Sequence, residues 1–91
     1  MTKRPLYVLE FIAFVDSGYV EEARKVWEDH DDIARRLSAD EALTLYEALR
    51  LFDEEGTLAE AFYDGVTKLE NKAARELVIR RRFGSKFEAG R

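Results

Sequence analysis

The sequence predicts an all-α fold, a small bundle of two αα-hairpins with a long or broken helix at its C-terminal end. Three observations carry this prediction. Apolar residues recur at intervals of three and four, glycines punctuate those patterns, and one helix–turn–helix pattern returns later in the chain. The 91 residues suffice for one domain, and with no cysteine and 46% hydrophobic residues its stability must come from side-chain packing.

The first hairpin is predicted over residues 6–30. Its first half is apolar on nearly every side except at Glu10, which is typical of a buried helix. The same residues are good strand formers, but the helical patterns around them favour a helix. Gly18 can adopt the left-handed conformation that ends a helix, and a second helix should then extend to about His30 with Trp27 on its apolar stripe.

The acidic segment 28–32 is predicted to interrupt the second helix. Four carboxylates in five positions repel one another, and aspartate is a poor helix former. Asp31 or Asp32 would then cap a short helical turn that carries Ile33 and Leu37. A connection between the two hairpins is therefore expected here.

The second hairpin is predicted from two capping boxes, in which the first and fourth residues of a segment bind each other's backbone N–H groups. The two boxes are Ser38 with Glu41 and Thr57 with Glu60. The first should start a helix over about residues 39–53, and Gly56 should end the turn that follows it. The second box should start another helix at Leu58.

The last helical pattern runs from Leu58 to Phe83, either as one long helix or as two helices divided at Asn71. Gly65 lies inside this pattern, where glycine costs about 1 kcal/mol relative to alanine. We expect the close approach of another helix to explain it. The C-terminal part of the fold is therefore predicted to be helical with one internal interruption at most.

Charge divides the chain into an acidic body and a basic end. The net charge is −4, with 17 acidic and 8 basic residues in 1–70 and 2 acidic and 7 basic residues in 71–91. Gly84 is predicted to stop the last helix, so that residues 1–84 form the helical domain and 85–91 a flexible basic tail. The basic end would either neutralise the acidic body or contact another molecule.

The two hairpin patterns are related by an offset of 38 residues. The matched pairs are Phe14 with Phe52, Gly18 with Gly56, Val20 with Leu58 and Ala23 with Ala61. A period of this kind indicates stacked helical hairpins. In segment 18–27, Gly18 is followed five residues later by Ala23, and Trp27 follows four residues after that.

This segment resembles the junction between the two helices of tetratricopeptide and pentatricopeptide repeats. The likeness covers residues 7–27 well and 45–65 poorly, and it departs from the pattern at Glu10 and Gly65. The resemblance implies a scaffold of helical hairpins. The spacing of 38 residues is longer than either family's usual repeat.

No pattern in the chain points to catalysis, a metal or a cofactor. His30 is the single histidine, and the residues after Asp29 do not fit a calcium-binding loop, because Ile33 stands at a ligand position and Ala34 stands where the loop needs a glycine. The glycines are isolated, so no phosphate-binding loop is present. We therefore predict a non-enzymatic protein and interpret the segment around His30 as a solvated acidic loop.

Three sets of candidate binding residues remain. Aromatic residues that could anchor a protein partner are Tyr19, Trp27, Tyr46 and Tyr63. Basic and aromatic residues that could contact nucleic acid are Arg75, Arg80, Arg81, Arg82, Phe83 and Lys86. Acidic residues that could mimic nucleic acid towards a basic partner are Glu21, Glu22, Glu28, Asp29, Asp31 and Asp32.

The prediction that follows is a protein-interaction module, or a small regulator or inhibitor, that binds a larger protein through a groove between the hairpins. A homodimer is a variant, and nucleic-acid binding and acidic mimicry are the alternatives. The longest near-apolar run, residues 6–15, is far shorter than the roughly 20 residues of a membrane span, so a cytoplasmic protein without membrane contact is expected.

Overall fold

The computed structural model describes the backbone of residues 4–68 and 72–89 and the side chains of residues 4–68 and 72–83. Within these residues all regular structure is helical, so the predicted all-α fold is confirmed. The elements are α1 (Leu6–Asp16), α2 (Val20–Asp29), the 3-10 helix η1 (Ala34–Arg36), α3 (Ala39–Phe52), α4 (Thr57–Thr67) and α5 (Lys72–Ala89).

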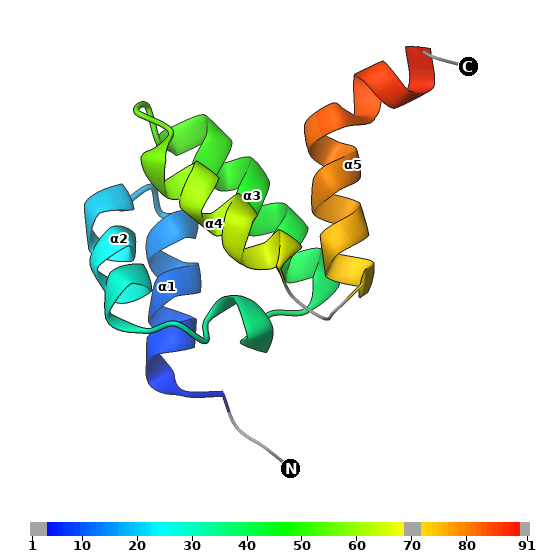
Figure 1. The fold of residues 1–91 in the computed structure, drawn as a ribbon. Coiled ribbons are helices and arrows are strands. Elements are labelled where there is room, and N and C mark those ends of the chain that lie inside the picture. The colour runs from blue at the N-terminus through cyan, green and yellow to red at the C-terminus, as the bar shows by residue number, and fades with distance from the viewer. Residues whose placement is uncertain (1–3, 69–71, 90–91) are drawn as a thin grey trace.

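The helices are arranged as two hairpins and a further helix (Figure 1). Helix α1 packs on α2, and α3 packs on α4. The two hairpins meet where α1 contacts α3 and where η1 contacts α4. Helix α5 packs on α3 and α4, which lie between it and the first hairpin in Figure 1. The pattern that begins at Leu58 is thus divided between α4 and α5.

Aromatic rings join the two hairpins at the centre of the core. The rings of Phe11 from α1 and Phe62 from α4 lie 6.0 Å apart, and both side chains are buried. The Trp27 ring from α2 lies 5.5 Å from that of Phe11 and 5.4 Å from that of Phe62. Such pairs contribute through burial and through ring geometry, so the hairpins are held by one shared cluster.

The turn of the first hairpin forms at Gly18, as predicted. Its φ angle is +80°, in the left-handed region that glycine adopts without steric cost. The N–H of Gly18 donates to the Val15 carbonyl at 3.1 Å, and the N–H of Tyr19 donates to the Phe14 carbonyl at 2.8 Å. These bonds satisfy carbonyls at the end of α1, which would otherwise lack partners.

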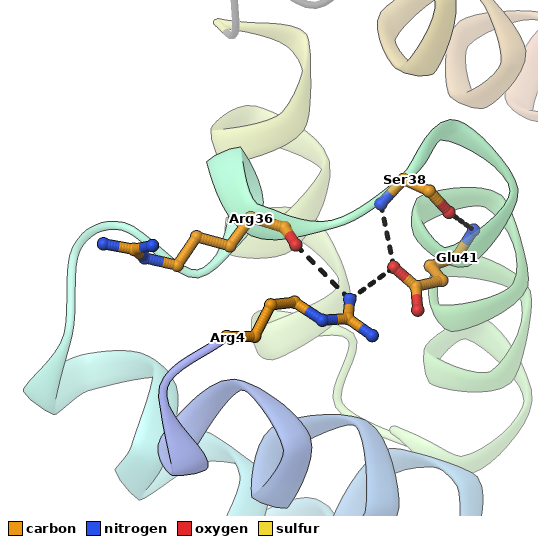
Figure 2. A network of polar contacts seen from close by, with 4 residues as sticks. All are labelled: Arg4, Arg36, Ser38 and Glu41. Carbon is orange, nitrogen blue, oxygen red and sulfur yellow. Dashed lines mark hydrogen bonds and ion pairs between the residues drawn. The ribbon is translucent and has the colours of Figure 1, made fainter. Parts of the chain in front are cut away.

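Helix α3 begins with the predicted capping box (Figure 2). The Glu41 N–H donates to Ser38 Oγ at 3.1 Å, and the Ser38 N–H donates to Glu41 Oε1 at 2.8 Å. Arg4 joins this network, because its Nη1 donates to Glu41 Oε1 at 2.6 Å and to the Arg36 carbonyl at 3.4 Å. The residues before α1 are thereby attached to η1 and α3.

The predicted capping box at Thr57 is wrong. Helix α4 begins at Thr57, and the residue before it, Gly56, has a φ of +78°. This left-handed turn brings the Asp53 carboxylate under the first turn of the helix. Asp53 Oδ2 accepts hydrogen bonds from the N–H groups of Leu58 at 2.8 Å and Ala59 at 3.0 Å. Asp53, only 6% exposed, is the residue that satisfies the start of α4.

Helix α1 is buried on one side only, contrary to the prediction. Val8, Phe11 and Val15 face the core, whereas Leu6 is 69% exposed and Leu9 is also exposed. Helices α2 and α3 cover one side of α1, and Phe62 of α4 packs on Phe11 of the same side. An apolar surface is therefore left on the outside of the helix.

Two predicted helix boundaries are also wrong. Gly84 does not stop the last helix, since α5 continues through it to Ala89. A glycine inside a helix costs only about 1 kcal/mol, so it does not by itself end one. Neither Asp31 nor Asp32 caps η1, which follows Ile33 without a side-chain cap. The Asp32 carboxylate is bound elsewhere, as described below.

Candidate partner-binding groove

An open groove of about 790 Å³ lies between the two hairpins, with walls from α2, η1 and α4. Its floor is apolar and is formed by Trp27, Ala34, Ala61 and Gly65, among other residues. We call this the inter-hairpin groove. Volumes of several hundred Å³ are typical of clefts that bind a ligand.

Trp27 lies at the floor of the groove because α4 carries a glycine opposite it. A Cβ atom at Gly65 would lie 3.0 Å from Cζ2 and Cη2 of the Trp27 ring. The predicted close approach at Gly65 therefore involves the side chain of Trp27, not the backbone of another helix. On its other sides the ring is held by Phe11 and Phe62, so the indole is positioned before any partner arrives.

Charged groups of both signs surround the apolar floor. Arg35, Lys68 and Asp31 are exposed at the edge of the groove. Arg24 also lines it, but its guanidinium donates to Thr57 Oγ1 at 2.7 Å and lies 3.7 Å from the Asp53 carboxylate. An apolar centre inside a polar rim is the general layout of protein-binding surfaces.

A polar cluster fixes the loop that forms one end of the groove. The Tyr7 hydroxyl donates to the Asp32 carboxylate, with oxygen distances of 2.6 and 2.9 Å, and Arg36 Nε donates to Asp32 Oδ2 at 2.7 Å. The ring of His30 stacks on that of Tyr7, with centroids 3.6 Å apart and planes inclined by 2°. The loop between α2 and η1 is thus attached to α1.

The cluster predicts a defined pH dependence of stability. The pKa of Asp32 is lowered, first by the hydrogen bond from Tyr7 and then by that from Arg36. A carboxylate whose pKa is lowered by folding stabilises the fold above its unfolded pKa, and this contribution is lost as the pH falls through the folded value. Stability measured by urea unfolding should therefore decrease below the usual titration range of aspartate.

Tyr7→Phe removes the largest cause of the lowered pKa, so this decrease should become shallower. Tyr63→Phe is the matched control, because Tyr63 lies in α4 against Tyr46 and Arg82, away from Asp32. It should keep the wild-type acid dependence. Identical acid profiles for the wild type and Tyr7→Phe would contradict the role of the hydroxyl.

The four aromatic candidates have different surroundings. Trp27 lines the groove, and Tyr19 at the turn of the first hairpin is 58% exposed. Tyr46 is only 2% exposed, so it belongs to the core and is not accessible to a partner. Tyr63 is half-buried, with the Arg82 guanidinium 4.3 Å from its ring centroid. The structure therefore does not bring the four side chains together.

The basic candidates on α5 are partly occupied within the chain. Arg81 pairs with Glu47 of α3, and Arg82 Nη1 lies 2.9 Å from Glu60 of α4. Arg75, Arg80 and Phe83 are exposed, whereas the side chain of Lys86 lies outside the described residues. Two of the arginines thus neutralise carboxylates of the acidic body.

The acidic candidates follow α2 and the loop after it. Asp32 is half-buried in the polar cluster, whereas the other five, Glu21, Glu22, Glu28, Asp29 and Asp31, are exposed. Arg24 lies among them, with its Nε 3.6 Å from the Glu21 carboxylate. Among the described residues no group of three or more His, Cys, Asp or Glu side chains could hold a metal ion. His30 stacks on Tyr7 without such a group around it.

The α4 side of the groove was not among the predicted site residues. Ala61 and Gly65 are one helical turn apart, and Lys68 follows on the same side of the helix. The spacing of Ala61 and Gly65 was the one sequence feature that could have pointed to this side of the groove. From the sequence, Gly65 could be interpreted only as a site of close packing, because the sequence does not show that Trp27 lies against it.

The comparisons with known proteins add no relative. No protein-family model matches the chain, and neither a curated protein nor a solved structure matches it. In the part of the chain that the structure describes, none of the helices combines the length and the apolar character needed to cross a membrane. The site must be interpreted from its own geometry.

Proposed function

We propose that the protein is a non-enzymatic interaction module that binds a segment of a larger protein in the inter-hairpin groove. The observation that carries this proposal is the position of Trp27, the single tryptophan of the chain, at the apolar floor between two hairpins. Tryptophan is enriched among the residues that contribute most to protein binding, particularly in a concave surface with a polar rim. A regulatory or inhibitory role would follow from such binding.

The shape of the floor suggests how a partner would be held. Ala34 and Ala61 have small side chains, which leaves room on the floor beside the indole for one apolar side chain of the partner. The exposed Arg35, Lys68 and Asp31 could then form hydrogen bonds at the rim. Helical hairpins resembling tetratricopeptide repeats would supply the scaffold, and we place its action in the cytoplasm.

The polar side chains beside the groove support a binding role over catalysis. Arg24 is engaged by Asp53 and Thr57, and His30 is stacked on Tyr7. Nucleic-acid binding is less well supported, because Arg81 and Arg82 already pair with carboxylates of the same chain. Acidic mimicry is less well supported as well, since Arg24 interrupts the acidic surface.

The proposal is tested by site-specific crosslinking in cells. A photoreactive p-benzoylphenylalanine at Ala61, on the groove floor, should capture a protein that the same residue at Ala73 does not. Ala73 is the matched control because it is an exposed alanine on a helix, α5, that does not line the groove. The captured protein would then be purified and its binding followed by the fluorescence of Trp27.

Ala61→Arg should raise the Kd of that protein at least tenfold, because the longer side chain fills the floor of the groove, whereas Ala73→Arg should leave the Kd unchanged. Equal capture from both positions, or unchanged affinity for Ala61→Arg, would overturn the proposal. Capture of a second copy of the chain would identify the groove as a homodimer interface instead.

A further inference from the structure

A second hollow, of about 400 Å³, lies between α3 and α5. It is lined by Glu47, Arg50 and Leu51 from α3 and by Arg81 and Arg82 from α5. The three residues of α3 follow one another at helical spacing, so they share one side of that helix. None of the five lines the inter-hairpin groove, whose walls come from α2, η1 and α4. We call this site the arginine hollow.

Positive charge is in excess in the arginine hollow. Three arginines meet there with one glutamate, although the chain as a whole has a net charge of −4. Arg50 is exposed, and it forms no ion pair with any residue that the structure describes. Its guanidinium carbon lies 5.7 Å from the centroid of the Tyr46 ring, which attracts the cation without neutralising it. One positive charge of the hollow is therefore left without an acidic partner.

The other two guanidiniums are only partly engaged. Arg81 pairs through Nε with Glu47, and Arg82 pairs through Nη1 with Glu60 of α4, at 3.1 and 2.9 Å from the two carboxylate oxygens. An arginine has five N–H donors in a planar fork. The remaining N–H groups of these two arginines have no hydrogen-bond acceptor among the described residues. Both side chains can thus bind a further oxygen without giving up their glutamates.

From this arrangement we propose that the arginine hollow binds a phosphorylated side chain of a protein partner. A phosphate monoester carries a charge of about −1.5 to −2 at pH 7 and three strong acceptor oxygens, so one such group can bind several guanidiniums at once. The planar fork of arginine matches the oxygens of a phosphate, which a single ammonium group does not. Clusters of arginines are a recurrent means of binding phosphorylated motifs.

The carboxylates around the site favour a single phosphate over a nucleic acid. Residues 1–70 contain 17 acidic and 8 basic residues. Glu55 and Glu60 line an adjoining hollow, which shares Arg50 and Arg82 with the arginine hollow. A polyanion that extends beyond the three arginines would approach these carboxylates, and like charges in contact oppose association. A compact dianion stays within the positive part of the surface.

An exposed leucine is the reason for assigning the phosphate to a peptide. Leu51 is 75% exposed and lines the hollow together with the arginines. Free phosphate would leave this side chain in water, whereas an apolar residue next to a phosphorylated one would cover it. Burial of apolar surface would then add to the ionic contact. The contribution of Leu51 therefore separates a phosphopeptide from free phosphate.

The experiment uses the full chain and two short synthetic peptides. Both have a central serine between leucines, and the serine is phosphorylated in one of them. Binding is measured by fluorescence anisotropy. The phosphopeptide should bind at least tenfold more tightly than the serine peptide, inorganic phosphate should compete with it, and its affinity should decrease as salt is raised. Equal binding of the two peptides, or no binding of either, would overturn the proposal.

Variants with opposite expected effects locate the binding in the arginine hollow. Arg50→Gln should raise the Kd of the phosphopeptide about tenfold, because one charged hydrogen-bond donor is lost. Glu47→Gln should lower the Kd about threefold, because it removes the carboxylate that competes for Arg81. Arg80→Gln is the matched control, at an exposed arginine of α5 outside the hollow, and should leave the Kd unchanged. Circular dichroism checks that each variant is folded, and an unchanged Kd for Arg50→Gln would contradict the proposal.

Two further measurements distinguish the source of the phosphate. Leu51→Gln should raise the Kd of the phosphopeptide about threefold and leave competition by inorganic phosphate unchanged, and no effect on the peptide would indicate a site for free phosphate instead. A single-stranded oligonucleotide that binds more tightly than the phosphopeptide, and that Arg80→Gln weakens as much as Arg50→Gln does, would overturn the proposal in favour of nucleic acid. Ala61→Arg should still bind the phosphopeptide, so the result is independent of the inter-hairpin groove.

Discussion

Replacing Asp53 with alanine is expected to lower the free energy of unfolding by about 3 kcal/mol. The carboxylate is buried, and it accepts hydrogen bonds from the N–H groups of Leu58 and Ala59 at the start of α4. It also lies 3.7 Å from the Arg24 guanidinium of the other hairpin. Alanine would leave two helix N–H groups and one half-buried guanidinium without this acceptor.

The loss is large for a chain of this size, whose total stability should lie in the range of about 5–15 kcal/mol. Urea unfolding followed by circular dichroism measures it, and the melting temperature should fall by roughly 12–24 °C. Asp53→Asn keeps one acceptor oxygen of the same shape and should lose only about 1 kcal/mol. Asparagine thus separates the hydrogen bonds from the negative charge.

Thr57→Ala distinguishes the observed cap from the one that the sequence pattern suggests. If Thr57 capped α4, its loss would cost about 1 kcal/mol or more. In the structure its hydroxyl accepts a hydrogen bond from Arg24 on the surface instead, so a smaller effect is expected. A larger loss for Thr57→Ala than for Asp53→Ala would contradict the assignment of the cap.

The two caps show which parts of the fold could be predicted from sequence. The box of Ser38 and Glu41 is a local arrangement within one helical turn, and it forms as predicted. The cap of α4 depends on Gly56, whose left-handed turn brings in a carboxylate from before the turn. The spacing of residues in the sequence does not show whether Asp53 or Thr57 caps α4, because that depends on the path of the backbone through the turn at Gly56.

Helix α1 shows the same limit for burial. Its apolar character on nearly every side predicted a helix, which is correct, and complete burial, which is wrong for Leu6 and Leu9. The apolar character of a residue shows that its burial would be favourable, but it does not show which other part of the chain packs on it. Which apolar residues stay exposed is decided by the packing of the other helices, and helix periodicity alone does not predict it.

A groove between the hairpins and its central residue were expected from the sequence, but the residues that line it from α4 were not. Trp27 was a candidate partner-binding residue from sequence, while Ala61 and Lys68 were not. They lie far from Trp27 in the chain and reach it only because the two hairpins pack on one aromatic cluster. Tyr46 illustrates the converse, because a tyrosine that could anchor a partner only if it were exposed lies in the core.

Trp27→Ala is expected to lower the free energy of unfolding by about 3 kcal/mol, at the lower end of the range for large aromatic residues because the side chain is only half-buried. The indole contacts Phe11 and Phe62 and fills the space left by Gly65. Its removal would separate the two hairpins at their common centre. Thermal unfolding followed by circular dichroism measures the loss.

Trp27→Phe provides the control because it keeps an aromatic ring between Phe11 and Phe62. We expect it to lose about 1 kcal/mol and to restore most of the melting temperature. If stability recovers while binding of a groove partner does not, the larger indole surface is needed for the partner and not for the fold. If Trp27→Ala is instead as stable as the wild type, Trp27 does not join the hairpins, and the groove lacks the fixed floor on which its proposed role depends.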